Sequence, residues 1–145
     1  MGSKVEQAVS YFQKGFSCSQ SIVASYCTEF GLNERIALKL ATGFGGGMGR
    51  LGKTCGAVTG ALMVIGLKYG RDKIEEEALK EKTYALVQKF INKFINLNKA
   101  ISCNELLECD ISTLEGLNSA KEKNLFSTLC PNFVRTSAEL LEKIL

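Results

Sequence analysis

The sequence contains no histidine and a single proline. The lack of histidine excludes the commonest general base, the usual nitrogen ligand of zinc and the usual axial ligand of haem. Long apolar runs are lacking too. The longest uncharged apolar run, residues 55–67, has 13 residues, whereas a membrane span needs about 20. We therefore expect a protein that does not insert into a membrane.

The chain also has only a small excess of positive over negative charge. The chain has 18 basic and 15 acidic residues, a net charge of +3, and no block of five or more basic residues. Proteins that bind nucleic acid usually carry a basic patch or stripe, so we expect no nucleic-acid partner. The first residues contain no apolar signal region, which predicts a cytoplasmic location.

No segment alternates polar and apolar residues with the period of a strand, and helical periodicity dominates instead. The expected helices cover residues 3–14, 18–30, 33–41, 55–69, a long stretch opening at Asp72, a short one near 103, part of 112–125, and 131–145. Asp72 and Glu75 would form the cap of the long helix, whose buried stripe would hold Leu79, Leu86, Phe90, Phe94 and Leu97. We predict an all-α fold, a single compact domain of six or seven helices over residues 1–145.

Cysteine is the residue type that carries possible chemistry. The chain has six, namely Cys18, Cys27, Cys55, Cys103, Cys109 and Cys130. In a cytosolic chain that is long enough to bury its own core, metal binding or redox chemistry is favoured over a disulfide framework. Cys27 follows Cys18 by nine residues, half a turn around a helix, so we interpret it as a buried structural residue. The role of Cys109 stays open.

Four of the cysteines are predicted to lie at helix N-termini. Ser17 with Gln20 forms a capping box before the helix of Cys18, and Ser102 with Glu105 forms one before the helix of Cys103. Thr54 is the expected N-cap of the helix that contains Cys55. Cys130 is itself the expected N-cap, because Pro131 favours the first helical position. Free N–H groups and the positive end of the helix dipole favour an anion there. The thiolate, which is the reactive and metal-binding form, is therefore favoured at all four positions.

Six glycines lie in residues 43–52, and residues 47–54 satisfy the phosphate-loop pattern GxxxxGK followed by Ser or Thr. That pattern binds phosphate only between a strand and a helix, and the preceding segment reads as an amphipathic helix. We therefore interpret the stretch as a loop that wraps the site beside Cys55. Arg50 and Lys53 would supply positive charge to that site or, more commonly, remain solvated.

The cysteines and the glycines together resemble the family of small redox-active proteins called C_GCAxxG_C_C. The matching parts are Cys18, the motif Cys55-Gly56-Ala57-Val58-Thr59-Gly60, Cys103 and Cys130. The resemblance implies an all-helical fold and a redox role for these four cysteines. Such proteins often have glycine where Cys109 stands. The family is also similar to the non-haem domain of split-Soret cytochromes, which is associated with an iron–sulfur centre.

Three functions follow from these observations. The first is an iron–sulfur cluster, [2Fe–2S], for electron transfer or sensing, bound by Cys18, Cys55, Cys103 and Cys130 with Gly56 beside it. The second is a thiol–disulfide oxidoreductase in which Cys55 is the nucleophile and another cysteine resolves. The third is a structural zinc site with the same four ligands. The expected partner is a redox protein that the sequence does not identify, and a cluster shared between subunits would imply a homodimer.

Overall fold

The computed structural model describes residues 3–145. Within this range the α-helices are α1 (Lys4–Gln13), α2 (Cys18–Tyr26), α3 (Glu34–Ala41), α4 (Gly56–Tyr69), α5 (Glu77–Asn98), α6 (Cys103–Leu107), α7 (Leu114–Glu122), α8 (Leu125–Thr128) and α9 (Cys130–Ile144). Two 3-10 helices, η1 (Cys27–Phe30) and η2 (Thr42–Phe44), extend α2 and α3. The described residues contain no strand, only an isolated bridge between Thr54 and Ser102. The all-α prediction is confirmed, and seven of the helices have eight residues or more.

Side-chain caps define where the N-terminal helices begin. Ser3, Ser17 and Asn33 each have extended backbone, and each side chain accepts a hydrogen bond from the N–H three residues on. Such caps satisfy N–H groups that have no partner inside the helix. At Ser17 the bond is reciprocal, because the Gln20 side chain also accepts from the Ser17 N–H at 3.0 Å. The predicted capping box is thus present.

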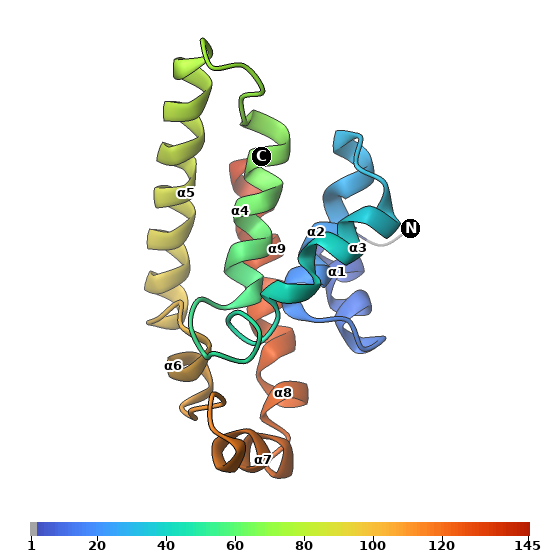
Figure 1. Ribbon diagram of the computed structural model, residues 1–145, viewed down its shortest axis with the longest axis vertical. Coiled ribbons are helices and arrows are strands. Elements are labelled where there is room, and N and C mark those ends of the chain that lie inside the picture. The colour runs from blue at the N-terminus through green and yellow to red at the C-terminus, as the bar shows by residue number, and fades with distance from the viewer. Residues whose placement is uncertain (1–2) are drawn as a thin grey trace.

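Helix α4 lies at the centre of the fold, between α5 and α2, and it also packs on α9 (Figure 1). It is apolar around most of its circumference, as expected of a helix that is covered on several sides. Gly56 allows α2 to come close, because a Cβ at this position would lie 2.8 Å from the Ser19 backbone nitrogen. Gly60 does the same, since its Cβ would lie 3.0 Å from the Ser19 carbonyl oxygen.

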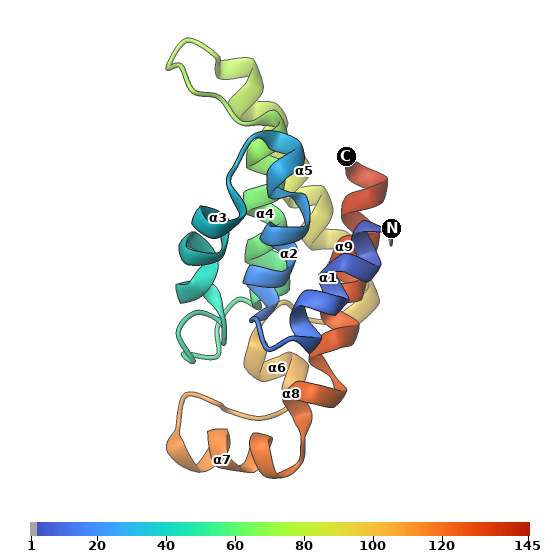
Figure 2. The same cartoon turned by 90° about the vertical axis from the view of Figure 1, so that its right-hand side faces the viewer.

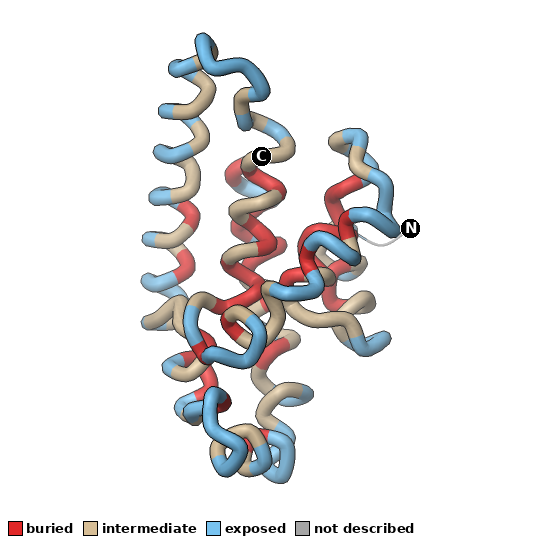
Figure 3. Tube along the Cα trace, viewed as in Figure 1, coloured by how far each residue is buried: buried red, intermediate tan, exposed pale blue. Residues whose placement is uncertain are grey.

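Helix α5 begins later and is less buried than predicted. Residues 70–76 form a loop, so Asp72 and Glu75 do not cap it, and the N-cap is Glu76. Of the expected stripe, Phe90 and Phe94 are fully buried, whereas Leu97, in the last turn of α5, is 64% exposed. Leu79 and Leu86 are only half-buried. The first turns of α5, which hold Leu79, extend beyond the rest of the bundle, where no other helix of the described chain covers them (Figure 3).

The other end of the molecule consists of short elements. Helices α6, α7 and α8 and the glycine-rich loop, residues 45–54, lie below the ends of α2 and α4 (Figure 2). A small core of Cys103, Leu107, Ile111, Ala120 and Cys130 holds this end together. No helix in the part of the chain that the structure describes is long and apolar enough to cross a membrane.

Candidate functional site

Four cysteines from four separate helices line one cavity, which has a volume of about 110 Å³. They are Cys18, Cys55, Cys103 and Cys130. The rest of the wall is formed by Phe12, Ser17, Gly46, Gly56, Leu106, Leu107, Phe126 and Phe133. Room for a single water takes about 10–15 Å³, so the cavity is several times larger than one water site. Its wall is apolar apart from the sulfurs, the Ser17 side chain and the backbone.

Cys18 and Cys55 belong to the two helices that the glycines of α4 bring into contact. Cys18 is the first residue of α2, directly after the capping residue Ser17. Cys55 is itself the N-cap of α4, with φ −59° and ψ 139°. The prediction that Thr54 would be that N-cap is wrong, because Thr54 pairs with Ser102 in the isolated bridge instead.

The bridge between Thr54 and Ser102 places Cys55 beside Cys103. The Cys55 N–H donates to the Ile101 carbonyl at 2.7 Å, and the Cys103 N–H donates to the Lys53 carbonyl at 2.5 Å. The two segments therefore run antiparallel for three residues, and α6 begins where they end. Cys103 is the first residue of α6, and Ser102 is its N-cap as predicted, accepting from the Glu105 N–H at 3.2 Å.

Cys130 comes from the last helix of the chain. It is the first residue of α9, and Leu129 occupies the N-cap position. The prediction that Cys130 would be the N-cap itself is therefore wrong by one residue. Pro131 is accommodated in the first turn, where the missing N–H costs nothing. The broader prediction holds, since all four cysteines lie at helix N-termini.

The thiols influence one another, and their pKa values move in opposite directions. The Cys18 thiol and the backbone N–H groups of Ala57 and Val58 stabilise the thiolate of Cys55 and lower its pKa despite burial. Hydrogen bonds of its thiol to the sulfurs of Cys130 and Cys55 raise the pKa of Cys18 well above its usual value. Burial, followed by repulsion from Cys55 and Cys130, raises the pKa of Cys103 to about 12. Cys55 is therefore the site's preferred thiolate over Cys18 and Cys103.

The model of one protein family matches residues 16–144 of this chain, and its description is "Putative redox-active protein (C_GCAxxG_C_C)". The chain belongs to the C_GCAxxG_C_C family. No curated protein and no solved structure matches the chain. The matched range includes all four cysteines that line the cavity.

The donor set of this C_GCAxxG_C_C protein is chemically suited to a thiolate-bound metal group. Within residues 3–145 no three or more His, Cys, Asp or Glu side chains are grouped so as to hold a metal ion. The four sulfurs instead surround the cavity. Thiolates are the protein ligands of iron–sulfur clusters, and the N–H groups of Ala57 and Val58 next to Cys55 are of the kind that bond to ligand sulfurs. The residue types present therefore match the donor chemistry of such a group, although the four sulfurs are not gathered into a metal-binding cluster in this arrangement.

The other two cysteines lie outside the cavity wall. Cys27 is fully buried in a separate small core with Val23, Ala37 and Ala41, which confirms its interpretation as a structural residue. Cys109 packs near Cys103 and Cys130, but its thiol donates to the Gly116 carbonyl at 3.2 Å and it does not line the cavity.

The glycine-rich loop is not a nucleotide site of the phosphate-loop type, because η2 rather than a strand precedes it. Its glycines instead allow the backbone of the loop to lie close to the cysteine cavity. Gly46 lines the cavity, and Gly47 packs against Cys103. Lys53 and Arg50 are both exposed and do not line the cavity.

Sequence reasoning did not identify the apolar part of the wall. Phe12 lies within the helix predicted over residues 3–14, and no sequence pattern pointed to Phe126 or Phe133. Leu106 and Leu107 follow Cys103 within one turn, which is the one pattern that could have placed them at the site.

Proposed function

We propose that Cys18, Cys55, Cys103 and Cys130 bind an iron–sulfur cluster, [2Fe–2S], and that the protein transfers electrons or senses redox state. The observation that carries this proposal is that four cysteines from four helix N-termini line one small apolar cavity. Such a cluster, when bound, would supply one-electron chemistry. The protein's membership of a family described as redox-active supports the same class of function.

Each part of the site has a physical task in this proposal. Four thiolates repel one another, and the helix N-termini reduce that cost by placing free N–H groups and positive dipole ends beside the sulfurs. Cys55 would ionise ahead of Cys18 and Cys103, since its thiolate already has hydrogen-bond donors. Phe12, Phe126 and Phe133 would exclude water from the bound group, and exclusion of water influences a reduction potential.

The test is metal and acid-labile sulfide content of the full chain, purified without oxygen, together with its visible spectrum. We expect iron and sulfide in near-equal amounts and loss of both when Cys55 or Cys103 is replaced by serine. Cys27→Ser and Cys109→Ser are matched controls, because neither residue lines the cavity, and they should retain the metal. No iron after anaerobic reconstitution would overturn the proposal, and bound zinc in its place would support a structural zinc site.

A second candidate function, thiol–disulfide exchange, has its own structural support. Cys18 and Cys55 line the same cavity and interact directly. The Cys55 thiolate would attack a substrate disulfide, forming a mixed disulfide and releasing one substrate thiolate. The Cys18 thiol would lose its proton to solvent and attack Cys55, forming a Cys18–Cys55 disulfide and releasing the second thiolate. Two electrons would pass from the cysteine pair to the substrate.

This second candidate is tested by trapping with a model disulfide and mass spectrometry of metal-free protein. Cys18→Ser should accumulate the mixed disulfide on Cys55, whereas Cys55→Ser should not react. Reaction confined to the more exposed Cys109 would exclude this mechanism.

A further inference from the structure

A second, larger cavity lies beside the cysteine cavity and has a volume of about 570 Å³. We call it the outer cleft. Its walls come from the turn after α1, the start of α2, the glycine-rich loop, and helices α7 and α8. Phe12, Ser17, Gly46 and Phe126 line both cavities, so the two share a wall. Pockets for small molecules typically measure about 300–1,000 Å³, and the outer cleft falls in that range.

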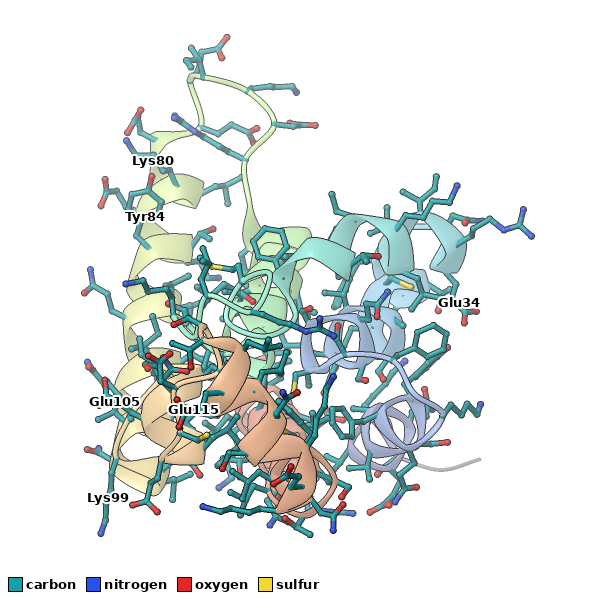
Figure 4. All side chains as sticks on the ribbon, turned by 60° about the horizontal axis from the view of Figure 1, so that its bottom comes forward. Glu34, Lys80, Tyr84, Lys99, Glu105 and Glu115 are labelled. Carbon is teal, nitrogen blue, oxygen red and sulfur yellow. The ribbon has the colours of Figure 1, made fainter. Side chains whose placement is uncertain are left out.

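The charged residues that line the outer cleft are all basic. Arg50 comes from the glycine-rich loop and Lys121 from α7, and both are exposed. No Asp or Glu among the described residues lines the cleft. The labelled carboxylates Glu105 and Glu115 lie on the side of the molecule away from α1 and α2 (Figure 4). A concave surface with charge of one sign concentrates ligands of the opposite sign, and here the favoured ligand is an anion.

The backbone of the glycine-rich loop adds hydrogen-bond donors. Gly46, Gly49 and Arg50 line the outer cleft with φ values of 71°, 57° and 69°. None of the backbone hydrogen bonds of normal geometry within residues 3–145 has an N–H of residues 46–50 as its donor. Loops with left-handed residues commonly direct such N–H groups at anions. Arg50 adopts this conformation at a cost that a glycine would not incur, and it places a cation in the same loop.

Aromatic side chains supply the apolar part of the outer cleft. Phe12, Phe16 and Phe126 are only partly buried. The Tyr11 ring packs against Phe16 with centroids 5.8 Å apart, which limits the mobility of Phe16. Aromatic rings bind flat apolar groups by offset stacking or edge-to-face contact. The cleft thus combines a flat apolar surface with a cationic rim.

We propose that the outer cleft binds a small organic anion with a flat aromatic body, its charged end held by Arg50, Lys121 and the N–H groups of the glycine-rich loop. This inference goes beyond the proposed function and does not depend on it. Binding in the outer cleft requires neither metal nor thiol chemistry.

The first test compares two fluorescent probes on the full chain, 8-anilinonaphthalene-1-sulfonate and N-phenyl-1-naphthylamine. The two share an aromatic body, and only the first carries a negative charge. We expect the sulfonate to bind at least roughly fivefold more tightly and to weaken as salt is added. Equal affinities, or no effect of salt, would overturn the recognition of an anion.

The second test locates the site with variants that change charge equally. Lys121→Gln removes a cation that lines the outer cleft, whereas Lys123→Gln removes an exposed one that does not. We expect Lys121→Gln and Arg50→Asn each to weaken sulfonate binding roughly threefold to fivefold, and Lys123→Gln to change it less than about twofold. In amide NMR spectra, the probe should shift Gly46 and Gly49. Equal effects of the two lysine variants, or shifts confined to other elements, would overturn the proposal.

Discussion

Gly47 packs directly against Cys103, so that a Cβ at Gly47 would lie only 2.7 Å from the Cβ of Cys103. The same Cβ would lie 2.5 Å from the Lys53 carbonyl oxygen, which accepts the Cys103 N–H. Gly47 also has φ 61°. The loop therefore reaches Cys103 only because position 47 has no side chain.

We expect Gly47→Ala to destabilise the protein by more than its backbone strain alone. Gly49→Ala is the matched control, because Gly49 also has a positive φ, 57°, but nothing lies within 4 Å of its Cβ position. Strain should cost each variant about 1 kcal/mol, and the clash in Gly47→Ala should add roughly 1–3 kcal/mol. Urea unfolding followed by circular dichroism measures both. Equal stabilities would show that the contact with Cys103 is easily relaxed.

A second pair of glycines tests the contact between α2 and α4. The Cβ of Gly56→Ala would lie 2.8 Å from the Ser19 nitrogen, whereas that of Gly66→Ala would meet nothing within 4 Å. Gly66→Ala should stabilise the protein by up to about 1 kcal/mol, the usual gain for alanine within a helix. Gly56→Ala should lower the free energy of unfolding by roughly 1–3 kcal/mol. A stabilised Gly56→Ala variant would contradict the close approach of the two helices.

The capping box at Ser17 is expected to position Cys18 as well as to stabilise α2. Ser17→Ala should lower stability by about 1 kcal/mol, because its hydroxyl accepts from the Gln20 N–H. Ser3→Ala removes a similar cap from α1 at a residue that does not line the cavity, and should cost about the same. Only Ser17→Ala should change the alkylation rate of Cys18, measured by mass spectrometry. Unchanged alkylation in both variants would assign the cap a purely structural role.

The sequence predicted the helices well where caps mark their starts, as at Ser17 and Asn33. It failed where the signals depend on the neighbouring structure. Thr54 is a good N-cap by type, but its backbone pairs with Ser102. Asp72 and Glu75 have the spacing of a cap, but no packing partner holds residues 70–76 in a helix. At these places the tertiary environment, and not the local sequence pattern, determines where the helix begins.

The set of four site cysteines was also predictable, both from the caps and from the family motif, but their meeting in one cavity was not derivable from spacing. Cys55 and Cys103 are 48 residues apart, and the bridge at Thr54 and Ser102 brings them together. No local pattern specifies that pairing. The outer cleft was missed for the same reason, because Arg50 and Lys121 meet only in the folded chain.

The buried thiol of Cys103 predicts a loss of stability at alkaline pH in the reduced, metal-free protein. Burial raises its pKa from 9.0 to about 12 in the folded state. Above the pH at which the thiol ionises in the unfolded chain, the folded state binds more protons than the unfolded state. The contribution of the Cys103 thiol to the free energy of unfolding is then fully present below about pH 9. It is lost as the pH rises toward 12, by at most about 1.4 kcal/mol per pH unit for one thiol.

Urea unfolding at a series of pH values between about 8 and 10 measures this slope. Burial also raises the pKa of Tyr26, so the native protein must be compared with a Cys103→Ala variant that retains Tyr26. Cys103→Ala should be less stable at neutral pH, because truncation leaves a void, but its stability should decline less steeply as pH rises. Parallel declines would mean that the Cys103 thiol ionises as readily in the folded state as in the unfolded chain, and burial would then not control its pKa.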